Sequence, residues 1–386
     1  MTEDVEFITD ENPVHRTLGI SWDPRQDNLL YNVKRIQPSK RVTKRYILSE
    51  IAKIFDLLGS LSPVILTSKV LIQKCWKAKT TWDESVSSAL YSAWQSFAEQ
   101  ILLIDDSKID RYVLINYPVN IQTHGFCDAS KTDYGACSYV RSCNEEGKIC
   151  VQLFCSKGCV APLKEQTIPR LELCGALILA RLYHEVFKVV TFRVCKTVFW
   201  SDLTIVLQWL RTHPSVLKVF KANHVPEIQA ASKDVEWRHV RSDQSPADGL
   251  SRGQLPQEFL NNESWFRGPS WLARPESAWP QFAKTTQDHL PGIKKVFCIA
   301  LLSRPEGIFE RFSSYTRLIR VIAYCLRFSN AKKVKGALTI KEIDEAEQRI
   351  VRLIQQSHFQ HKIEFKIDLP IGCKYLECLS FNYQAL

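Results

Sequence analysis

The region between residues 120 and 250 follows an order of elements that few folds accommodate. Three extended runs occur in succession, and the apolar periodicity then predicts one long helix. Beyond this helix the sequence predicts a strand, a helix, a helical stretch, a strand and a final helix. The predicted segments are 120–127, 134–141, 149–156, 169–187, 194–200, 203–212, 216–232, 235–240 and a helix from Pro246. Three meandering strands followed by alternating helices and strands predict an α/β domain, with helices flanking a mixed sheet.

Four carboxylates occur in this region, each at a predicted strand end or helix start. They are Asp128, Glu172, Asp202 and Asp248, in the segments HGFCDAS, IPRLELCGAL, FWSDLTIVLQWL and SPADGLSRG. Two divalent cations about 4 Å apart need several converging carboxylates to hold them against a phosphodiester. The order and spacing of the four acids therefore favour a two-metal nuclease.

Three of these acids also fit ordinary structural roles. Asp128 has the context of a turn residue at a strand end, and Asp202 that of a helix N-cap. Asp248 lies three residues after Ser245, as in a capping box. Glu172 is harder to explain in this way, because it is the only charged residue between Arg170 and Arg181 and lies in the apolar run LELCGALILA. A carboxylate in such a run needs a partner or a cation, which favours a shared site.

Longer phrases in the same region resemble a known family. FCDASKTDYGACSYVR, FWSDLTIVLQWLRTHPSVLKVFKANHVPEIQ and SPADGLSRG resemble the ribonuclease H region of Bel-Pao retrotransposon Pol polyproteins, and the resemblance covers residues 119–275. It implies the ribonuclease H-like fold and hydrolysis of the RNA strand of an RNA-DNA hybrid, which leaves a 3′ hydroxyl and a 5′ phosphate. The four acids match the Asp-Glu-Asp-Asp set of this family.

The resemblance also implies a cofactor and a role for each acid. The expected cofactor is a pair of Mg²⁺ ions, with Mn²⁺ as an alternative. Asp128 would bridge both ions. Glu172 and Asp202 would complete the coordination of the ion that stabilises the leaving 3′ oxygen, and Asp248 would help to hold the ion that activates water.

Two departures from the family pattern bear on activity. Leu203 follows Asp202 where a small hydroxyl residue is usual, and HVRSDQSPAD replaces the expected lead into Asp248. The alternative function is therefore a catalytically inactive, decayed or domesticated remnant that binds nucleic acid. A peptidase is not predicted, because the tripeptides Asp-Thr-Gly and Asp-Ser-Gly are both absent from the sequence.

The flanking segments resemble other parts of the same polyprotein. LGISWDPRQDNLLYNV resembles the last strands of a reverse transcriptase palm, TKRYILSEIAKIFDLLGSLSPVILTSKVLIQKCW the thumb and connection, and ALTIKEIDEAEQRIVRLIQQSHF the helical bridge to integrase. These resemblances predict a palm end with thumb and connection over 1–118, a ribonuclease H-like domain over 119–255, and a truncated linker and helical region over 256–386. Polymerase and integrase activities are not expected of this chain, and the missing palm is a candidate partner that would cover apolar faces around 51–66.

The C-terminal region contains two predicted helices and a set of metal-ligand residue types. Thr339 and Glu342 are predicted to form a capping box, and an earlier helix carries an apolar stripe. The stripe consists of Phe309, Phe312, Leu318, Ile319, Ile322 and Leu326. In the tail, the histidine pair and the cysteine pair are separated by only eleven residues, so zinc binding by His358, His361, Cys373 and Cys378 is not favoured.

Composition limits the class of protein. With 45% hydrophobic and 24% charged residues, the 386-residue chain is expected to form two or three packed units without bulk disorder. The N-terminal MTEDVEFITDE lacks the apolar core of a secretory signal, and no run is long enough to span a membrane. Thirteen irregularly spaced cysteines are typical of reduced thiols. An intracellular protein, cytoplasmic or nuclear and without a membrane partner, is therefore expected.

The net charge of +10 is compatible with a nucleic-acid partner. Lys218, Lys221 and His224 lie on the helical stretch after Asp202, and Arg170 lies beside Glu172. We predict that these four residues contact the backbone of an RNA-DNA hybrid or another nucleic acid, which gives affinity without sequence preference. The alternative for the lysines is a solvated helix face.

Overall fold

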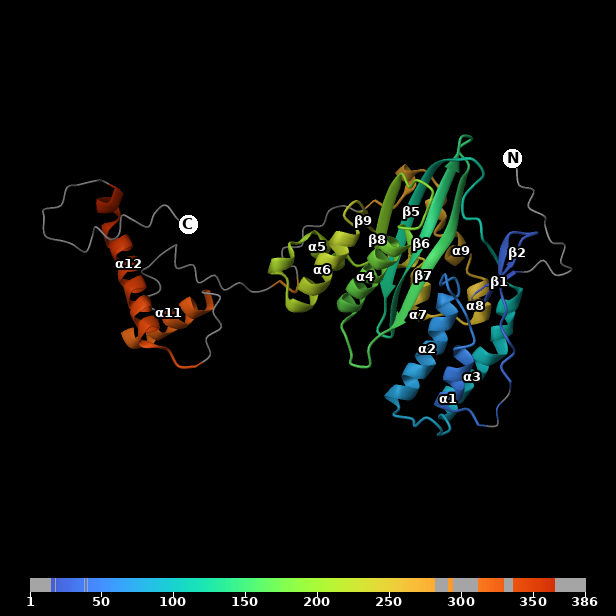
Figure 1. Ribbon diagram of the computed structural model, residues 1–386, viewed down its shortest axis with the longest axis horizontal. Helices are drawn as coiled ribbons and strands as arrows, with labels where there is room; N and C mark the ends of the chain where they lie inside the picture. Colours follow the sequence, from blue (N-terminus) through green and yellow to red (C-terminus); the bar gives the residue numbers. More distant parts are fainter. Residues whose placement is uncertain are drawn as a thin grey trace, which may run out of the picture. The chain divides into compact units, whose positions relative to one another are not determined.

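The computed structural model describes residues 15–17, 19–37, 39, 41–281, 291–293, 312–329 and 336–364. Contacts divide the chain into two units, residues 1–294 and 295–386 (Figure 1). The predicted domain boundaries at 118 and 255 both lie within the first unit and stay predictions. Phe309, Cys373, Cys378 and the side chains of His358 and His361 lie outside the described residues.

A five-stranded mixed sheet forms the centre of the first unit (Figure 1). Strands β5 (Pro118–Ala129), β6 (Asp133–Asn144) and β7 (Ile149–Val160) form an antiparallel meander. Strands β8 (Lys196–Ser201) and β9 (Glu236–His239) extend the sheet in parallel beyond β5, which gives the order β7-β6-β5-β8-β9. The predicted α/β class with a mixed sheet is confirmed.

Helices connect the parallel strands and cover one face of the sheet. Helix α4 (Ile168–Val186) joins β7 to β8, and α5 (Thr204–Arg211), the 3₁₀ turn η2 (Pro214–Val216) and α6 (Val219–Ala231) join β8 to β9. Apolar side chains of these helices pack with residues of β5, β6 and β8 in one cluster, which includes Leu173, Leu179, Phe199 and Trp209. Since the apolar positions recur at helical spacing, burial of this face explains why these segments are helical.

The first three strands are longer than predicted. Each has twelve residues, and β6 continues through Arg141 to Asn144. Arg141 is buried and donates from Nε to the carbonyl of Leu272 at 2.9 Å and from Nη2 to that of Arg274 at 3.2 Å. These partners lie more than 130 positions away in the chain, so local sequence patterns could not indicate these bonds.

The second face of the sheet is covered by chain that follows the last strand. After η3 (Ser242–Gln244) and α7 (Asp248–Arg252), the short helices α8 (Pro256–Leu260) and α9 (Glu263–Arg267) and the turns η4 (Ser270–Ala273) and η5 (Glu276–Ala278) contribute apolar side chains to the core. Trp271 stacks edge-on against Trp200 of β8, with ring centroids 4.8 Å apart. Trp265 is fully buried and donates from Nε1 to the carbonyl of Ser60 at 2.8 Å.

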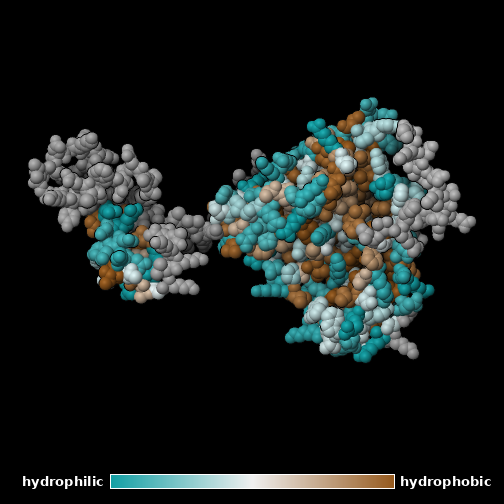
Figure 2. All heavy atoms as spheres, in the orientation of Figure 1, coloured by the Kyte–Doolittle hydropathy of each residue, from teal (hydrophilic) through white to brown (hydrophobic). Residues whose placement is uncertain are grey.

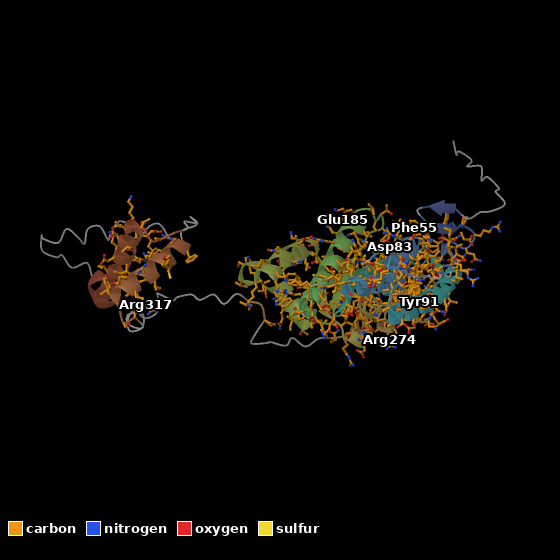
Figure 3. All side chains as sticks on the ribbon, turned by 90° about the horizontal axis from the view of Figure 1, so that it is seen from below. Phe55, Asp83, Tyr91, Glu185, Arg274 and Arg317 are labelled. Carbon is orange, nitrogen blue, oxygen red and sulfur yellow. The ribbon has the colours of Figure 1, made fainter. Side chains whose placement is uncertain are left out.

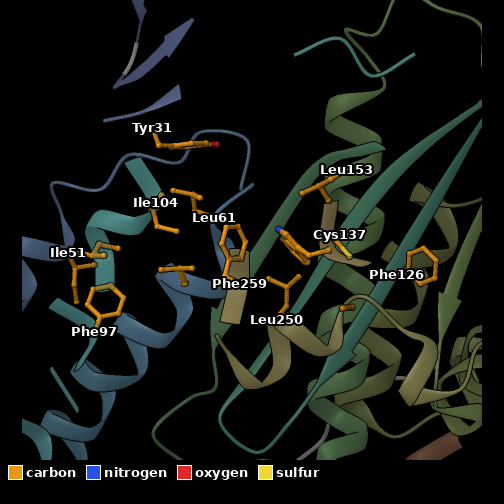
Figure 4. Close-up of a cluster of buried hydrophobic side chains, with 14 of the residues drawn as sticks. Tyr31, Ile51, Leu61, Phe97, Ile104, Phe126, Cys137, Leu153, Leu250 and Phe259 are labelled. Carbon is orange, nitrogen blue, oxygen red and sulfur yellow. The ribbon is translucent and has the colours of Figure 1, made fainter. Parts of the chain in front are cut away.

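The N-terminal elements of the first unit pack against the edge of the sheet. They are a small antiparallel sheet of β1 (His15–Thr17), β2 (Ile20–Asp23), β3 (Asn28–Tyr31) and β4 (Lys108–Asp110), helices α1 (Lys44–Ile51), α2 (Ser62–Lys77) and α3 (Ser88–Gln100), and η1 (Ile101–Asp106). Figure 4 shows that their side chains, including Phe97 and Leu61, belong to the same buried cluster as Phe259 and Phe126. The helical segment and the sheet therefore share one hydrophobic core.

Apolar exposure in the segment 51–66 is restricted to the loop before α2. Ile51 and Leu66 are buried, whereas Phe55 and Leu57 are 57% and 65% exposed. Phe55 is labelled in Figure 3.

Along β6 and β7, Figure 2 shows a band of hydrophobic residues on the side that faces the viewer. In the described part of the chain, no helix combines the length and apolar content that a membrane span requires.

The described part of the second unit consists of α11 (Tyr315–Ser329) and α12 (Ile340–Glu364). The predicted stripe residues Leu318, Ile319 and Ile322 are buried against α12. The predicted capping box is confirmed, because the Thr339 N–H donates to Glu342 Oε2 at 2.8 Å and the Glu342 N–H donates to Thr339 Oγ1 at 3.4 Å.

Candidate metal centre

Three of the four predicted acids converge at one end of the central sheet. Asp128 lies near the end of β5, and Asp202 directly follows β8. These strands are parallel neighbours in which Cys127 pairs with Ser201, so the two aspartates that follow are adjacent. Glu172 reaches the same place from the first turns of α4. One carboxylate oxygen from each of the three residues lies within 4.8 Å of the others.

A glycine on α4 allows the helix to lie close to these strands. A Cβ atom at Gly175 would lie 3.3 Å from the carbonyl oxygens of both Asp128 and Gly135, which is tighter than ordinary contact. Glycine at this position therefore permits an approach that a larger residue would widen. The close approach brings Glu172, three residues earlier on α4, to the end of β5.

The Glu172 side chain is only 2% exposed, and half of its hydrogen-bonding capacity is unused. Its Oε1 accepts the backbone N–H of Ala129 at 2.8 Å, whereas its Oε2 has no hydrogen-bond partner among the described residues. Burial raises the pKa of Glu172 to about 10, and the nearby carboxylates of Asp128 and Asp202 add to the shift.

The two aspartates show the same electrostatic pattern. Burial raises the pKa of Asp128 to about 6, the neighbouring hydroxyl of Ser251 opposes the shift, and the charges of Asp202 and Asp248 increase it. Burial also raises the pKa of Asp202, and its Oδ1 has no hydrogen-bond partner within the described ranges. Crowded carboxylates with unpaired buried oxygens fit a cation, which would compensate their charge.

Asp248 lies at the rim of this group and not among the three converging acids. It begins α7, its side chain is 36% exposed, and it pairs with Arg252 at 2.8 Å. Its charge raises the pKa of both Asp128 and Asp202, so it contributes to the same field. The alternative capping role for Ser245 is not observed, because in the described structure its Oγ has no hydrogen-bond partner and the N-cap is Ala247.

Two residues near the acids were not predicted from the sequence. Ser251 is buried on α7 beside Asp128, and His239 ends β9 with its Nε2 2.9 Å from the carbonyl oxygen of Asp202. Ser251 is three residues after Asp248 in the SPADGLSRG phrase, a spacing that places both residues on one helix face. No comparable local signal indicates His239, because strand pairing brings it to Asp202.

The four predicted nucleic-acid contacts gather around the start of α6. The guanidinium of Arg170 lies 4.9 Å from the ring centroid of Phe220, and the ring of His224 stacks on Phe220 at 4.3 Å. Lys221 lies 4.3 Å from the ring of Trp209, and burial lowers its pKa, with Arg170 and Lys218 adding to the effect. Lys218 is exposed. The structure therefore brings all four residues into one basic cluster.

Replacing Glu172 with Gln is expected to stabilise the metal-free protein, and more so at higher pH. The folded-state pKa is raised above the ordinary 4.5, so the carboxyl costs stability progressively as pH rises from there towards about 10. Gln keeps the oxygen that accepts the Ala129 N–H and cannot ionise. In EDTA, the melting temperature of Glu172→Gln should exceed that of wild type by a margin that grows with pH. Between about pH 5 and pH 8 this margin should increase by at least about 2 °C, or roughly 1 kcal/mol of unfolding free energy.

The matched control is Glu185→Gln, an exposed acid near the C-terminal end of the same helix. Its melting temperature should differ from wild type by a similar amount at both pH values. An advantage of Glu172→Gln that does not change with pH would contradict the expected cost of ionising the buried carboxyl.

Comparison with known proteins gives a family match for part of the chain. Residues 43–203 match the family model described as Pao retrotransposon-like RNaseH-like domain. The match begins before α1 and ends just after Asp202, so it includes Asp128, Glu172 and Asp202 but not Asp248. No curated protein matches the sequence. Together with the strand order, the family match confirms the predicted ribonuclease H-like fold.

Solved structures with partial similarity include ribonucleases H and a reverse transcriptase. Ribonuclease H1 from the halophilic archaeon Halobacterium salinarum is 14% identical, with a TM-score of 0.23 over 36% of this chain and 98% of that one. LC11-RNase H1 from compost, in complex with an RNA/DNA hybrid, is 13% identical, with a TM-score of 0.24 over 36% and 99%. A foamy viral protease-reverse transcriptase in complex with double-stranded DNA is 11% identical, with a TM-score of 0.36 over 59% and 38%.

Proposed function

We propose that the chain acts as a metal-dependent ribonuclease H, which hydrolyses the RNA strand of an RNA-DNA hybrid. The observation that carries this proposal is the convergence of three carboxylates, two of them with unpaired oxygens, at the end of a mixed sheet. Such a group costs stability in the absence of a cation, and the family match covers the segment that contains it. The basic cluster around the start of α6 supports a polyanionic substrate.

The residues fit a pair of Mg²⁺ ions, or Mn²⁺ in their place, because all of the donors are hard carboxylate oxygens. Asp128, Glu172 and Asp202 would hold the ions, and Asp248 would contribute from the rim. Bound divalent cations supply charge neutralisation of the phosphodiester and activation of water. None of these steps requires a side-chain nucleophile.

The other residues of the chain have defined parts in this mechanism. The Ala129 N–H orients Glu172 through its bond to Oε1. Arg170, Lys218 and His224 would contact phosphates and fix the position of the hybrid, whereas Lys221 is partly withdrawn against Trp209. Contacts with 2′-hydroxyls would distinguish the RNA strand from the DNA strand.

We further propose that the chain derives from a retrotransposon Pol polyprotein. In this interpretation residues 1–118 correspond to a palm end with thumb and connection, residues 119–255 to the nuclease, and residues 256–386 to a region that precedes integrase. The match of residues 43–203 to a retrotransposon family model supports this origin.

The test is cleavage of an end-labelled RNA-DNA hybrid by the full-length protein in Mg²⁺, with the same sequence as double-stranded DNA and as double-stranded RNA beside it. We expect cutting of only the RNA strand of the hybrid, with 3′ hydroxyl ends. Binding of the hybrid without cutting would instead support the inactive remnant. Absence of both binding and cutting would contradict either function.

Lys218→Ala is expected to weaken hybrid binding to a similar extent for every sequence tested. Lys218 is exposed at the start of α6, and the loss of one phosphate contact should reduce the slope of log affinity against log salt by about 1. Titration at several salt concentrations measures this slope. Lys148→Ala, at the exposed β6–β7 turn, is the matched control, and equal slopes for the two variants would exclude a contact at Lys218.

A further inference from the structure

We infer that His239 is a positioning residue for Asp202, which fixes the turn that presents its carboxylate to the metal centre. This inference rests on the proposed function, because it assigns the histidine to the same site. His239 is half-buried and lies outside the group of converging acids, so it acts through the backbone of Asp202 and not as a metal ligand.

The pairing of β8 with β9 places the histidine beside the turn. These parallel strands pair Ser201 with His239, and the Val240 N–H donates to the carbonyl of Ser201 at 3.1 Å. The ladder ends at this pair. At the next position, the imidazole Nε2 of His239 lies 2.9 Å from the carbonyl oxygen of Asp202. The side chain thus supplies a hydrogen bond just beyond the end of the backbone ladder.

The chemistry of this contact fixes the tautomer of the histidine. A carbonyl oxygen can only accept, so Nε2 of His239 must carry the proton and donate it. A glutamine side chain at the same position has an N–H donor at its end, whereas alanine has none. Glutamine is therefore a conservative replacement for His239, because it removes the imidazole but keeps a hydrogen-bond donor. Comparison with alanine then separates the effect of the hydrogen bond from the effect of losing the side chain.

Other contacts also hold this turn, including the hydroxyl of Ser242, which bonds to the carboxylate of Asp202. The Leu203 N–H donates to Ser201 Oγ at 3.3 Å, and Leu203 adopts an extended backbone with φ −99° and ψ 104° before α5 begins at Thr204. Asp202 therefore lies between the end of a strand and the start of a helix. The Ser201 carbonyl before it accepts the Val240 N–H, and helical bonds begin only at the Leu203 carbonyl. Rotation of this turn would move the carboxylate away from Asp128 and Glu172.

The side chain of Leu203 does not oppose this arrangement. It is partly buried against the cluster formed by α4, α5 and α6. Packing of Leu203 into the core holds the far end of the turn. His239 holds the carbonyl of Asp202, and the next residue, Leu203, packs into the core.

The test compares His239→Ala and His239→Gln in the full-length protein, with His213→Ala as the control. His213 is an exposed histidine that bonds locally to Ser215, remote in sequence from the acids. Mn²⁺ affinity measured by calorimetry is the first readout, because it does not depend on cleavage. Loss of an outer partner of a metal site typically costs 10–100-fold, so we expect about a tenfold loss of affinity for His239→Ala.

For His239→Gln and His213→Ala we expect Mn²⁺ affinity close to wild type. In cleavage assays, kcat should fall for His239→Ala while KM stays unchanged, because the substrate contacts are on other elements. Wild-type Mn²⁺ affinity in His239→Ala would overturn the positioning role, and so would an equal loss in His239→Gln. Mn²⁺ binding by a wild-type protein that cuts no hybrid would overturn the proposed activity alone, and absence of binding would overturn both.

Discussion

Asp128→Asn is expected to reduce hydrolysis of the RNA strand by roughly 10³-fold or more, equivalent to about 4 kcal/mol of transition-state stabilisation. Asp128 lies on the central strand and converges with the other two acids. The resemblance to ribonuclease H regions implies that it would contact both cations. Asn has nearly the same shape, so the sheet should be retained. The substitution removes the negative charge that the cations require, and in their absence it relieves repulsion between neighbouring carboxylates.

Single-turnover cleavage at saturating Mg²⁺ measures this loss without interference from product release. The matched control is Asp133→Asn, since Asp133 is also buried, and burial likewise raises its pKa to about 6. It begins the neighbouring strand β6 but is not one of the three converging acids. The control should cut at nearly the wild-type rate. Activity of Asp128→Asn within about tenfold of wild type would exclude a metal-bridging role.

A chain that ends at residue 255 is expected not to fold into the native first unit. The segment beyond this point carries Phe259, Trp265, Trp271, Leu272 and Trp279, which are all buried in the main core. Truncation of one buried aromatic side chain costs about 3–5 kcal/mol, and whole domains are stable by only about 5–15 kcal/mol. The loss of four such aromatic residues together with Leu272 exceeds that margin.

Circular dichroism and limited proteolysis of residues 1–255 and 1–294 measure the effect. The longer chain contains the whole first unit and should melt cooperatively, whereas the shorter one should show no cooperative transition. The point variant Trp265→Ala in the full-length chain gives a graded version of the test. Its expected loss is about 3–5 kcal/mol. A cooperative melt of residues 1–255 would contradict this expectation, because it would show that the sheet is stable without the segment that packs on its second face.

The central fold was predictable because its sequence is locally consistent. Apolar periodicity identified the strands and helices between residues 120 and 250, and strand order then brought Asp128 beside Asp202. Glu172 was identifiable from a charge in an apolar run. In each case the signal lies within a few residues of the feature that it predicts.

Other features depend on contacts between distant parts of the chain and have no local signal. Arg141 bonds to carbonyls after residue 270, and His239 reaches Asp202 only through pairing of β8 with β9. Tertiary structure decided each of these outcomes.

The contacts along β7 have a consequence for the behaviour of the protein in solution. An outer strand of twelve residues offers a template on which another copy could add a strand, the usual route to edge-to-edge aggregation. Here the Ser156 N–H of β7 already donates to the carbonyl of Leu58 at 2.9 Å. Just beyond the end of β7, Gln73 of α2 donates to the carbonyl of Ala161 at 2.6 Å. The N-terminal segment that contains Leu58 and α2 therefore prevents another copy of the chain from pairing with β7. A nuclease domain separated from this segment would be prone to form insoluble aggregates.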